Sequence, residues 1–549
     1  MEQNIIIMIT KFSGNIVDVF RKEIFSGTIF VEDKRILRIE RSNTGNSGGY
    51  ILPGFVDSHI HIESSMLTPQ NFADIAITHG TVGVVSDPHE IANVLGLDGV
   101  KYMLENAALS KLKFCFGAPS CVPATPFEKS GGEISADDIE YLFKEEGLHF
   151  LSEVMNFPGV ISGDKLVIDK ISIAKKYKKR IDGHAPGLRG IKLNKYISEG
   201  IETDHESYTY DEAREKIQKG MKIQIRQGSA AKNFKELARL IDEYPEDVFL
   251  CTDDLHPDDL LDGHINRLIT LGLEMNVNLF NLLRAVTINP VQHYGLDIGL
   301  LRANDPADFI VVEDLEKFSI LKTVINGELV FEKGNKPEIN ISKSAPNRFT
   351  TKLLFPEQLK VPDHSRTVRV IEAINGELLT RSSYAVLSVA DGSLQTDINI
   401  DVLKIVILNR YTNQPPAVAF IRNFGLKKGA IASSVSHDSH NIIAVGVNDK
   451  DITDCMNWII ERKGGISVST GDAISGLNLP VAGIMSVEPC LKVSEQYKKL
   501  KAITKTLGCT LDEPFMTLSF MGLLVIPELK MSYKGLFDVE KFNFTSLYK

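Results

Sequence analysis

Short runs of apolar residues alternate with charged ones at the start of the chain. Between residues 14 and 40, β-branched and aromatic residues alternate with charged positions, and the runs break at Ser26-Gly27 and at Glu32-Asp33-Lys34. Alternation of this kind is typical of half-exposed strands, in which successive side chains point to opposite faces. The sequence therefore predicts a small β-meander here.

From Ile51 onward the apolar runs are separated by stretches with helical periodicity. Examples of these runs are 83–85, 148–151 and 248–250. Strands that alternate with helices favour a parallel α/β fold. Because the stretch from 51 to 285 approaches the roughly 250 residues of a (β/α)8 barrel, we expect a TIM-like barrel.

Strand-like alternation returns after a helical pattern at 279–287. The stretches 308–312, 323–325 and 329–332 resemble a second half of the opening meander, and residues 333–350 have the aperiodic, Lys-, Asn-, Ser- and Pro-rich composition of a linker. The predicted division is a small β-domain built from both flanks (1–50 and 286–340), a barrel (51–285), a linker (341–350) and a mixed α/β C-terminal domain (351–549).

Charge and composition narrow the classes of partner. The 549 residues include 61 basic and 71 acidic side chains, a net charge of −10, so no overall positive field draws the protein to nucleic acid or to an anionic membrane. No apolar run approaches the roughly 18 residues of a membrane span. Six cysteines without a Cys-x-x-Cys pair fit a reducing compartment. We expect a cytoplasmic protein with no nucleic-acid or membrane partner.

The segment Asp57-Ser58-His59-Ile60-His61 has the spacing of a metal site. In a strand, residues i and i+2 point to the same side, so His59 and His61 can bind one ion, and Asp57 shares their face. Taken alone, such a motif is more often a surface His-x-His that arises by chance.

Four further candidate ligands follow apolar runs in the same stretch. They are Glu153, His184, His205 and Asp253. Each alone reads as an ordinary polar residue at a strand end, but the C-terminal ends of barrel strands meet at one pocket. Four imidazoles and two carboxylates suffice for two divalent ions, and mixed nitrogen and oxygen ligands suit manganese, iron or zinc.

Two other pairs of residues are candidates for proton transfer or an additional metal. His89 and Glu90 follow the run at 82–85, where the alternative is a helix start, since Asp-Pro followed by Glu commonly opens one. His437 and His440, three residues apart, can share one face and cap the pocket or bind an ion, unless they form a structural turn.

Arg226 and Ser229 follow another β-rich run. They would contact a substrate or position a metal-bound group, and the alternative is that both are loop residues before a helix.

Together these residues resemble the amidohydrolase superfamily. That family carries His-x-His after the first barrel strand, a bridging Lys or Glu after the fourth, single His residues after the fifth and sixth, and Asp after the eighth. The six matching positions, in order, are His59, His61, Glu153, His184, His205 and Asp253. The segments PGFVDSHIHIESSM, SDPHEIANVLG, EVMNFPGV and IRQGSAAKN look like adenine deaminases in particular, and SSVSHDSHNIIAVG and PFMTLSFMGLLVIPEL resemble the C-terminal domain of that family.

The resemblance implies a homodimeric aminohydrolase of purine salvage that converts adenine to hypoxanthine and ammonia with two divalent metals per chain, manganese foremost. Hydroxide from water of lowered pKa would attack C6. We expect Asp253 to take the water proton and deliver it to the leaving ammonia, and His205 to orient the hydroxide. We expect Glu90 to be a further proton carrier, or with His89 to hold an additional metal. Asp254 would hydrogen-bond a ring nitrogen, as in similar segments of purine deaminases, or remain a solvated loop carboxylate.

Two other functions stay open. Another cyclic amidine or amide hydrolase would use the same ligand set, because one fold serves several leaving groups. A non-catalytic metal-binding protein would keep the metals for structure alone. Turnover of purines and cyclic amides by the metal-loaded protein distinguishes the three.

Overall fold

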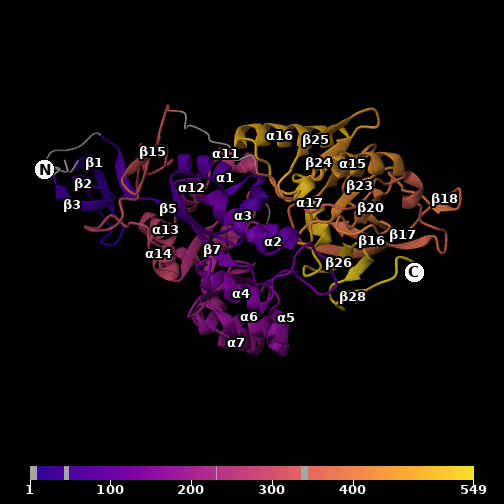
Figure 1. Ribbon diagram of the computed structural model, residues 1–549, viewed down its shortest axis with the longest axis horizontal. Helices are drawn as coiled ribbons and strands as arrows, with labels where there is room; N and C mark the ends of the chain where they lie inside the picture. The colour runs from indigo at the N-terminus through magenta and orange to yellow at the C-terminus, as the bar shows by residue number, and fades with distance from the viewer. Residues whose placement is uncertain (1–8, 43–47, 230, 336–343) are drawn as a thin grey trace.

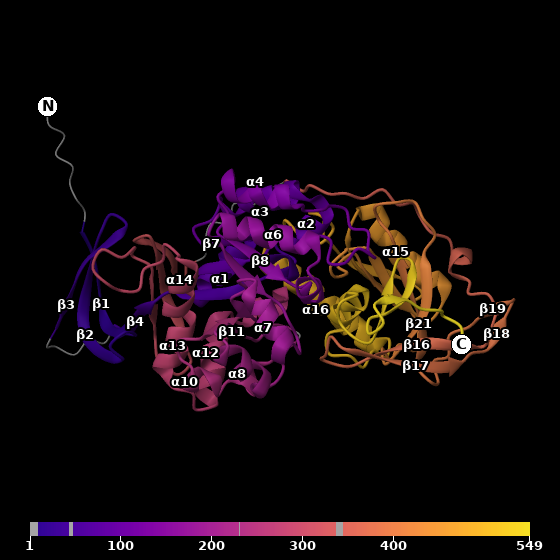
Figure 2. The ribbon, with the colours of Figure 1, turned by 90° about the horizontal axis from the view of Figure 1, so that it is seen from below.

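The computed structural model describes residues 9–42, 48–229, 231–335 and 344–549. Its three parts lie in a row, with a small sheet at the N-terminal end, a helix-rich central unit and a C-terminal unit (Figure 1). The same order is visible after a quarter turn (Figure 2). No helix among the described residues is long and apolar enough to cross a membrane.

The small sheet joins the beginning of the chain to a segment nearly 300 residues later. Its seven strands, in spatial order, are β15 (Glu328–Glu332), β14 (Ile320–Ile325), β13 (Phe309–Val312), β4 (Tyr50–Pro53), β1 (Ile9–Asp18), β2 (Glu23–Glu32) and β3 (Arg35–Arg41). Both flanks thus contribute to one sheet, as the returning alternation predicts. Residues 341–343 of the expected linker lie outside the described residues, and 344–350 form neither helix nor strand.

The central unit contains eight short parallel strands. They are β5 (Phe55–Ile60), β6 (Thr81–Ser86), β7 (Lys113–Ala118), β8 (Phe150–Val154), β9 (Arg180–Gly183), β10 (Thr203–Asp204), β11 (Lys222–Arg226) and β12 (Val248–Cys251). Strands β5, β6 and β8 are buried at every position, which explains their continuous apolar runs. The ladder divides into a five-stranded sheet, β5 to β9, and a three-stranded sheet, β10 to β12. The structure therefore has a curled parallel α/β sheet rather than the uninterrupted barrel predicted from the sequence.

Helices follow most of these strands and cover the outside of the curled sheet. They are α1 (Pro69–Ala76), α2 (His89–Leu95), α3 (Leu97–Ala107), α4 (Ala136–Lys144), α5 (Phe157–Ser162), α6 (Lys165–Lys176), α7 (Gly190–Ser198), α8 (Tyr210–Gln218), α9 (Phe234–Leu237), α10 (Leu240–Glu243), α11 (Pro257–Asp262), α12 (Ile265–Glu274), α13 (Leu279–Val286) and α14 (Ile288–Tyr294). The local sequence determines where several of these helices begin. Ser135 and Asp138 form a capping box at α4, and Asn278 accepts hydrogen bonds from two backbone amides at α13.

The C-terminal unit is built around an eight-stranded mixed sheet. In spatial order its strands are β17 (Thr380–Val386), β16 (Thr367–Ala373), β21 (Ala417–Arg422), β20 (Val402–Leu408), β23 (Ile442–Gly446), β22 (Ala430–Ser433), β24 (Gly465–Ser469) and β25 (Ile474–Asn478). Smaller pairings and helices complete the unit: β18 (Val389–Ala390), β19 (Ser393–Leu394), α15 (Asp449–Arg462), α16 (Cys490–Thr506), α17 (Pro514–Ser519), β26 (Leu529–Ser532), β27 (Gly535–Asp538) and β28 (Asn543–Phe544). Buried residues of α15 share an apolar cluster with residues of β20, β22 and β23.

Helix α16 docks the C-terminal unit onto α11 of the central unit. Lys501 Nζ donates to Asp258 Oδ2 at 3.0 Å, and the Tyr497 hydroxyl lies 2.8 Å from His256 Nδ1. Tyr497 and His256 are both buried. The two units therefore share a packed, polar-paired interface beside the carboxyl ends of the central strands.

Candidate metal centre and its surroundings

The six candidate ligands lie at the carboxyl ends of the parallel strands. In chain order they are His59 and His61 (β5), Glu153 (β8), His184 (β9), His205 (β10) and Asp253 (β12). Asp253 has a φ of +56°, its backbone N–H donates to the His59 carbonyl at 2.9 Å, and its own carbonyl accepts from the His61 N–H at 3.3 Å. These two bonds bring the carboxylate that follows the eighth strand beside the histidines of the first.

One group of ligand atoms surrounds His61 Nε2. This nitrogen lies 3.2 Å from His59 Nε2, 3.3 Å from Glu153 Oε1 and 3.2 Å from Asp253 Oδ1. Metal–ligand bonds of about 2.1 Å set neighbouring ligand atoms roughly 3.0–3.4 Å apart in octahedral or tetrahedral geometry. The spacing therefore fits a single cation held by two imidazoles and two carboxylates.

A second group shares Glu153. Its other oxygen, Oε2, lies 2.7 Å from His184 Nδ1 and 3.1 Å from His205 Nε2, and those two nitrogens are 3.3 Å apart. Although burial raises the pKa of Glu153, the imidazoles of His184 and His205 hold it well below its usual value. An ionised carboxylate with one oxygen in each group has the arrangement needed to bridge two cations.

Arg226 lies behind this cluster rather than in the pocket. It is 1% exposed, its Nη2 donates to Glu206 Oε2 at 2.9 Å, and its Nη1 donates both to Glu206 and to Asp253 Oδ2. Burial raises the pKa of Asp253, but the guanidinium and the histidines hold it well below the usual value. Arg226 thus keeps Asp253 ionised and oriented. Glu206 was missed from the sequence, although it follows a candidate ligand directly.

The second polar cluster of the central unit meets the His437–His440 segment. His89 and Glu90 open α2, and each oxygen of the Glu90 carboxylate contacts one imidazole, His437 through Nδ1 and His440 through Nε2. Burial lowers the pKa of His437, but the ion pair with Glu90 outweighs it and raises that pKa to about 9, whereas burial lowers the pKa of His440 to about 4. Asp438, also missed from the sequence, places Oδ2 3.9 Å from His89 Nε2.

The two remaining predicted residues differ in their placement. Asp254 lines the pocket and accepts a hydrogen bond from the Ser64 hydroxyl. Ser229 does not line this pocket: its hydroxyl donates to Asp259 Oδ2 at 2.6 Å and accepts from the His256 backbone N–H at 2.8 Å. This arrangement supports the loop alternative for Ser229 and gives no support to its expected contact with a substrate.

The pocket is polar on one side and apolar on the other. Imidazoles and carboxylates of the central unit face Leu378, Phe520, Leu523 and Ile526 of the C-terminal unit, which pack together in one apolar cluster. The cavity between the two sides has a volume of about 30 Å³.

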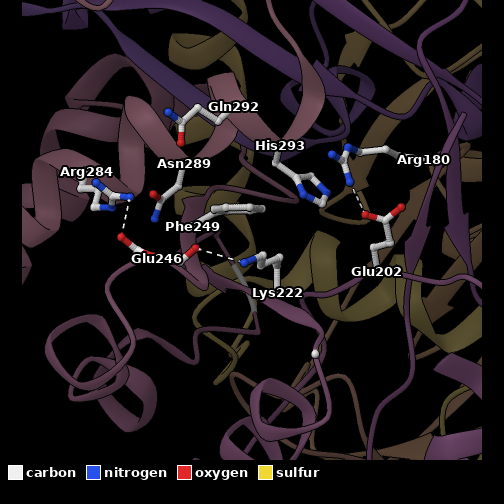
Figure 3. Close-up of a pocket in the computed structure, with 10 residues that line it drawn as sticks. Arg180, Glu202, Lys222, Glu246, Phe249, Arg284, Asn289, Gln292 and His293 are labelled. Carbon is white, nitrogen blue, oxygen red and sulfur yellow. Dashed lines mark hydrogen bonds and ion pairs between the residues drawn. The ribbon is translucent and has the colours of Figure 1, made fainter. Parts of the chain in front are cut away.

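A larger cavity of about 310 Å³ lies at the opposite, amino-terminal ends of the strands (Figure 3). Its charged side chains pair with one another: Arg180 contacts Glu202, and Arg284 Nη2 lies 3.1 Å from Glu246 Oε1. Lys222 Nζ pairs with a residue outside the lining, Asp247, whose Oδ1 lies 2.5 Å away. The candidate ligands are all absent from the residues that line it. Chemistry rather than volume therefore identifies the smaller pocket as the functional site.

Comparison with known proteins identifies the class. Residues 50–330 match the family model described as "Amidohydrolase family", and residues 377–543 match the model described as "Adenine deaminase C-terminal domain". The chain belongs to the amidohydrolase family. Within that family it is a member of the adenine deaminases, because both models match in order and because full-length relatives carry that name.

Those relatives cover essentially the whole chain. The chain is 52% identical over 549 residues to the adenine deaminase of Methanosarcina acetivorans, with 98% of this chain and 99% of that protein covered. It is 52% identical over 540 residues to that of Sulfurovum sp. (97% and 99% covered) and 47% identical over 538 residues to that of Salinibacter ruber (98% of each covered).

Proposed function

We propose that the buried His and carboxylate cluster is the active site of an adenine deaminase of purine salvage, which hydrolyses adenine to hypoxanthine and ammonia. The observation that carries this proposal is the Glu153 carboxylate, which has one oxygen among His59, His61 and Asp253 and the other between two further imidazoles. The substrate is inferred from the family to which the chain belongs, and the cluster provides the groups that would catalyse the reaction.

The eight parallel strands act as one (β/α)8 barrel in this proposal. At one junction of the two sheets, a bridge pairs Ile60 with Asp253. At the other, the Glu202 N–H donates to the Ile181 carbonyl at 2.9 Å. Both contacts support a barrel closed by short links instead of continuous ladders. They explain how ligands from both sheets reach one pocket.

Two manganese ions per chain suit the ligand set. His59, His61 and Asp253 would hold one ion and His184 and His205 the other, with Glu153 between them. Iron or zinc accepts the same nitrogen and oxygen ligands. Such ions lower the pKa of water toward neutrality and so supply hydroxide for hydrolysis.

The protein side chains then move protons and hold the base. Asp253, kept ionised by Arg226, takes the proton of the attacking water and returns it to the departing ammonia. His205 stacks on His59 at 4.0 Å between ring centroids and fixes the approach of the water. Glu90 exchanges a proton with the purine ring, and Asp254 hydrogen-bonds a ring nitrogen.

Ammonia release tests the assignment. We expect manganese-loaded protein to release ammonia from adenine but not from adenosine, cytosine or guanine. Asp253→Asn should lose at least about 100-fold in kcat, since a positioned proton carrier contributes about 10²–10⁴-fold. Chelator-stripped protein should lose at least as much, because the hydroxide would no longer form near neutral pH. Asp472→Asn, which changes an exposed carboxylate of the C-terminal unit, serves as the matched control and keeps full activity. If protein with two bound metals releases no ammonia from adenine, adenine is refuted as the substrate. Hydrolysis of another cyclic amidine would remain the alternative.

A further inference from the structure

The carboxylate of Glu90 is held by the C-terminal unit rather than by its own. Glu90 lies in the first turn of α2, and both of its oxygens contact imidazoles of the loop between β22 and β23. Glu90, His437 and His440 are 2%, 4% and 1% exposed, so water does not compete for these contacts. Because a buried carboxylate without donors is strongly destabilised, the two imidazoles determine where Glu90 points.

The hydrogen-bonding role of His440 follows from its other nitrogen. His440 Nδ1 lies 3.3 Å from the backbone N of Ser436, and a backbone amide can only donate. Nδ1 is therefore an acceptor without a proton. In the neutral ring the proton then sits on Nε2, which donates it to Glu90 Oε2. The Ser436 carbonyl accepts the His440 N–H at 2.7 Å and fixes the same turn.

His437 is oriented by different neighbours. Its ring stacks on Phe520, with centroids 4.3 Å apart and planes at 20°, and its backbone N–H donates to the Ser519 carbonyl at 3.1 Å. These contacts leave Nδ1 facing Glu90 Oε1. Two N–H donors, each fixed independently, thus define the plane of one carboxylate.

We propose that His437 and His440 are positioning residues that hold the Glu90 carboxylate toward the metal pocket, so that the active site is complete only when the C-terminal unit is docked. Without them, Glu90 would rotate toward His89, whose Nε2 already lies 3.6 Å from Oε1. The loss would fall on the proton-transfer step and not on the binding of adenine. This inference rests on the proposed role of Glu90 in catalysis.

Asn and Gln substitutions test this geometry, because their side-chain N–H donors differ in position by the length of one bond. Asn places its side-chain nitrogen where His has Nδ1, and Gln places it near the position of Nε2. His437→Asn and His440→Gln therefore keep each donor in place, whereas His437→Gln and His440→Asn displace it. Steady-state kinetics with adenine, metal content per chain and thermal unfolding are measured for all four variants, and His364→Asn changes an exposed histidine of the same unit as control.

We expect the displaced variants to lose at least about 30-fold in kcat, which is part of the roughly 10²–10⁴-fold that one positioned proton carrier contributes. KM and metal content should stay within threefold of the parent. The matched variants should stay within about fivefold of the parent kcat. Equal losses in matched and displaced variants, or losses in proportion to metal content, would overturn the proposal.

A Glu90→Gln variant, measured in parallel, distinguishes the positioning role of His437 and His440 from the catalytic role of Glu90 on which it rests. Full activity in Glu90→Gln would refute the role of Glu90 itself, and with it any need for positioning. An inactive Glu90→Gln together with fully active displaced variants would refute the positioning role alone.

Discussion

Lys530 offers a quantitative test of the packing beside the pocket. This lysine of β26 is completely buried, and its Nζ donates to the carbonyl oxygen of Leu378, a residue of the pocket wall, at 2.7 Å. Burial lowers its pKa from 10.5 to about 7. At about 1.4 kcal/mol per pH unit, burial of this group reduces the free energy of unfolding at pH 7 by up to about 4 kcal/mol.

The sign of the pH dependence follows from proton binding. Below pH 7 both states carry the ammonium, so the penalty is constant. Between pH 7 and about 10 the unfolded chain holds a proton that the folded protein lacks, and the free energy of unfolding rises by up to about 1.4 kcal/mol per pH unit. The Lys530→Met variant has neither the penalty nor the slope.

Urea unfolding at pH 7, 8 and 9 measures this difference. We expect Lys530→Met to be more stable than the parent by about 2–4 kcal/mol at pH 7. This range already includes the loss of the hydrogen bond to Leu378, which contributes a net of about 1 kcal/mol. The advantage should shrink by pH 9. Lys534→Met, an exposed change in the same hairpin, should show neither effect. An advantage that stays constant from pH 7 to 9, or a variant less stable throughout, would refute the reasoning.

Two further predictions concern the supports of the metal pocket. Lys216, fully buried, donates to Asp204 at 2.9 Å and to Glu212 at 2.8 Å; Lys216→Met should lower the free energy of unfolding by about 3–5 kcal/mol, because it leaves buried carboxylates unpaired, and a loss under 1 kcal/mol in urea unfolding would contradict this. Removal of metal by chelation should lower the thermal midpoint and readdition of manganese should restore it, since a ligand that binds only the folded state stabilises it; an unchanged midpoint in a scanning calorimeter would argue against a preformed metal site.

The candidate ligands were predictable because their positions follow from periodicity and topology. An apolar run marks a buried strand, and a parallel sheet sends every strand end to the same edge, so Glu153 and Asp253 meet His59 although the intervening chain is long. The returning alternation after residue 308 likewise predicted strands of a second half of the opening meander; in the structure the first of them, β13, pairs with β4 in the small sheet. These inferences need only local patterns and one rule of architecture.

The contacts between units were beyond that reasoning. The sequence left open whether His437 and His440 cap the pocket, bind an ion or form a turn, because their partner Glu90 lies more than 340 residues earlier. That pairing depends on how the C-terminal unit packs against the central unit, to which the contacts of α16 with α11 contribute. The sequence likewise left Ser229 open, as a substrate contact or a loop residue before a helix. In the structure its hydroxyl donates to Asp259 in the first turn of α11, a contact that no local pattern indicates. The break of the parallel sheet also left no trace in the periodicity.

The central and C-terminal units contribute different kinds of side chain to the pocket. All six candidate metal ligands belong to the central unit, so metal affinity depends on strand ends that the C-terminal unit does not supply. The apolar wall, including Phe520 and Ile526, and both donors to Glu90 belong to the C-terminal unit. The C-terminal unit thus supplies both one wall of the pocket and the two imidazoles that contact Glu90. The apolar wall of the pocket and the orientation of Glu90 therefore depend on the same contact between the two units, whereas the positions of the six candidate ligands do not.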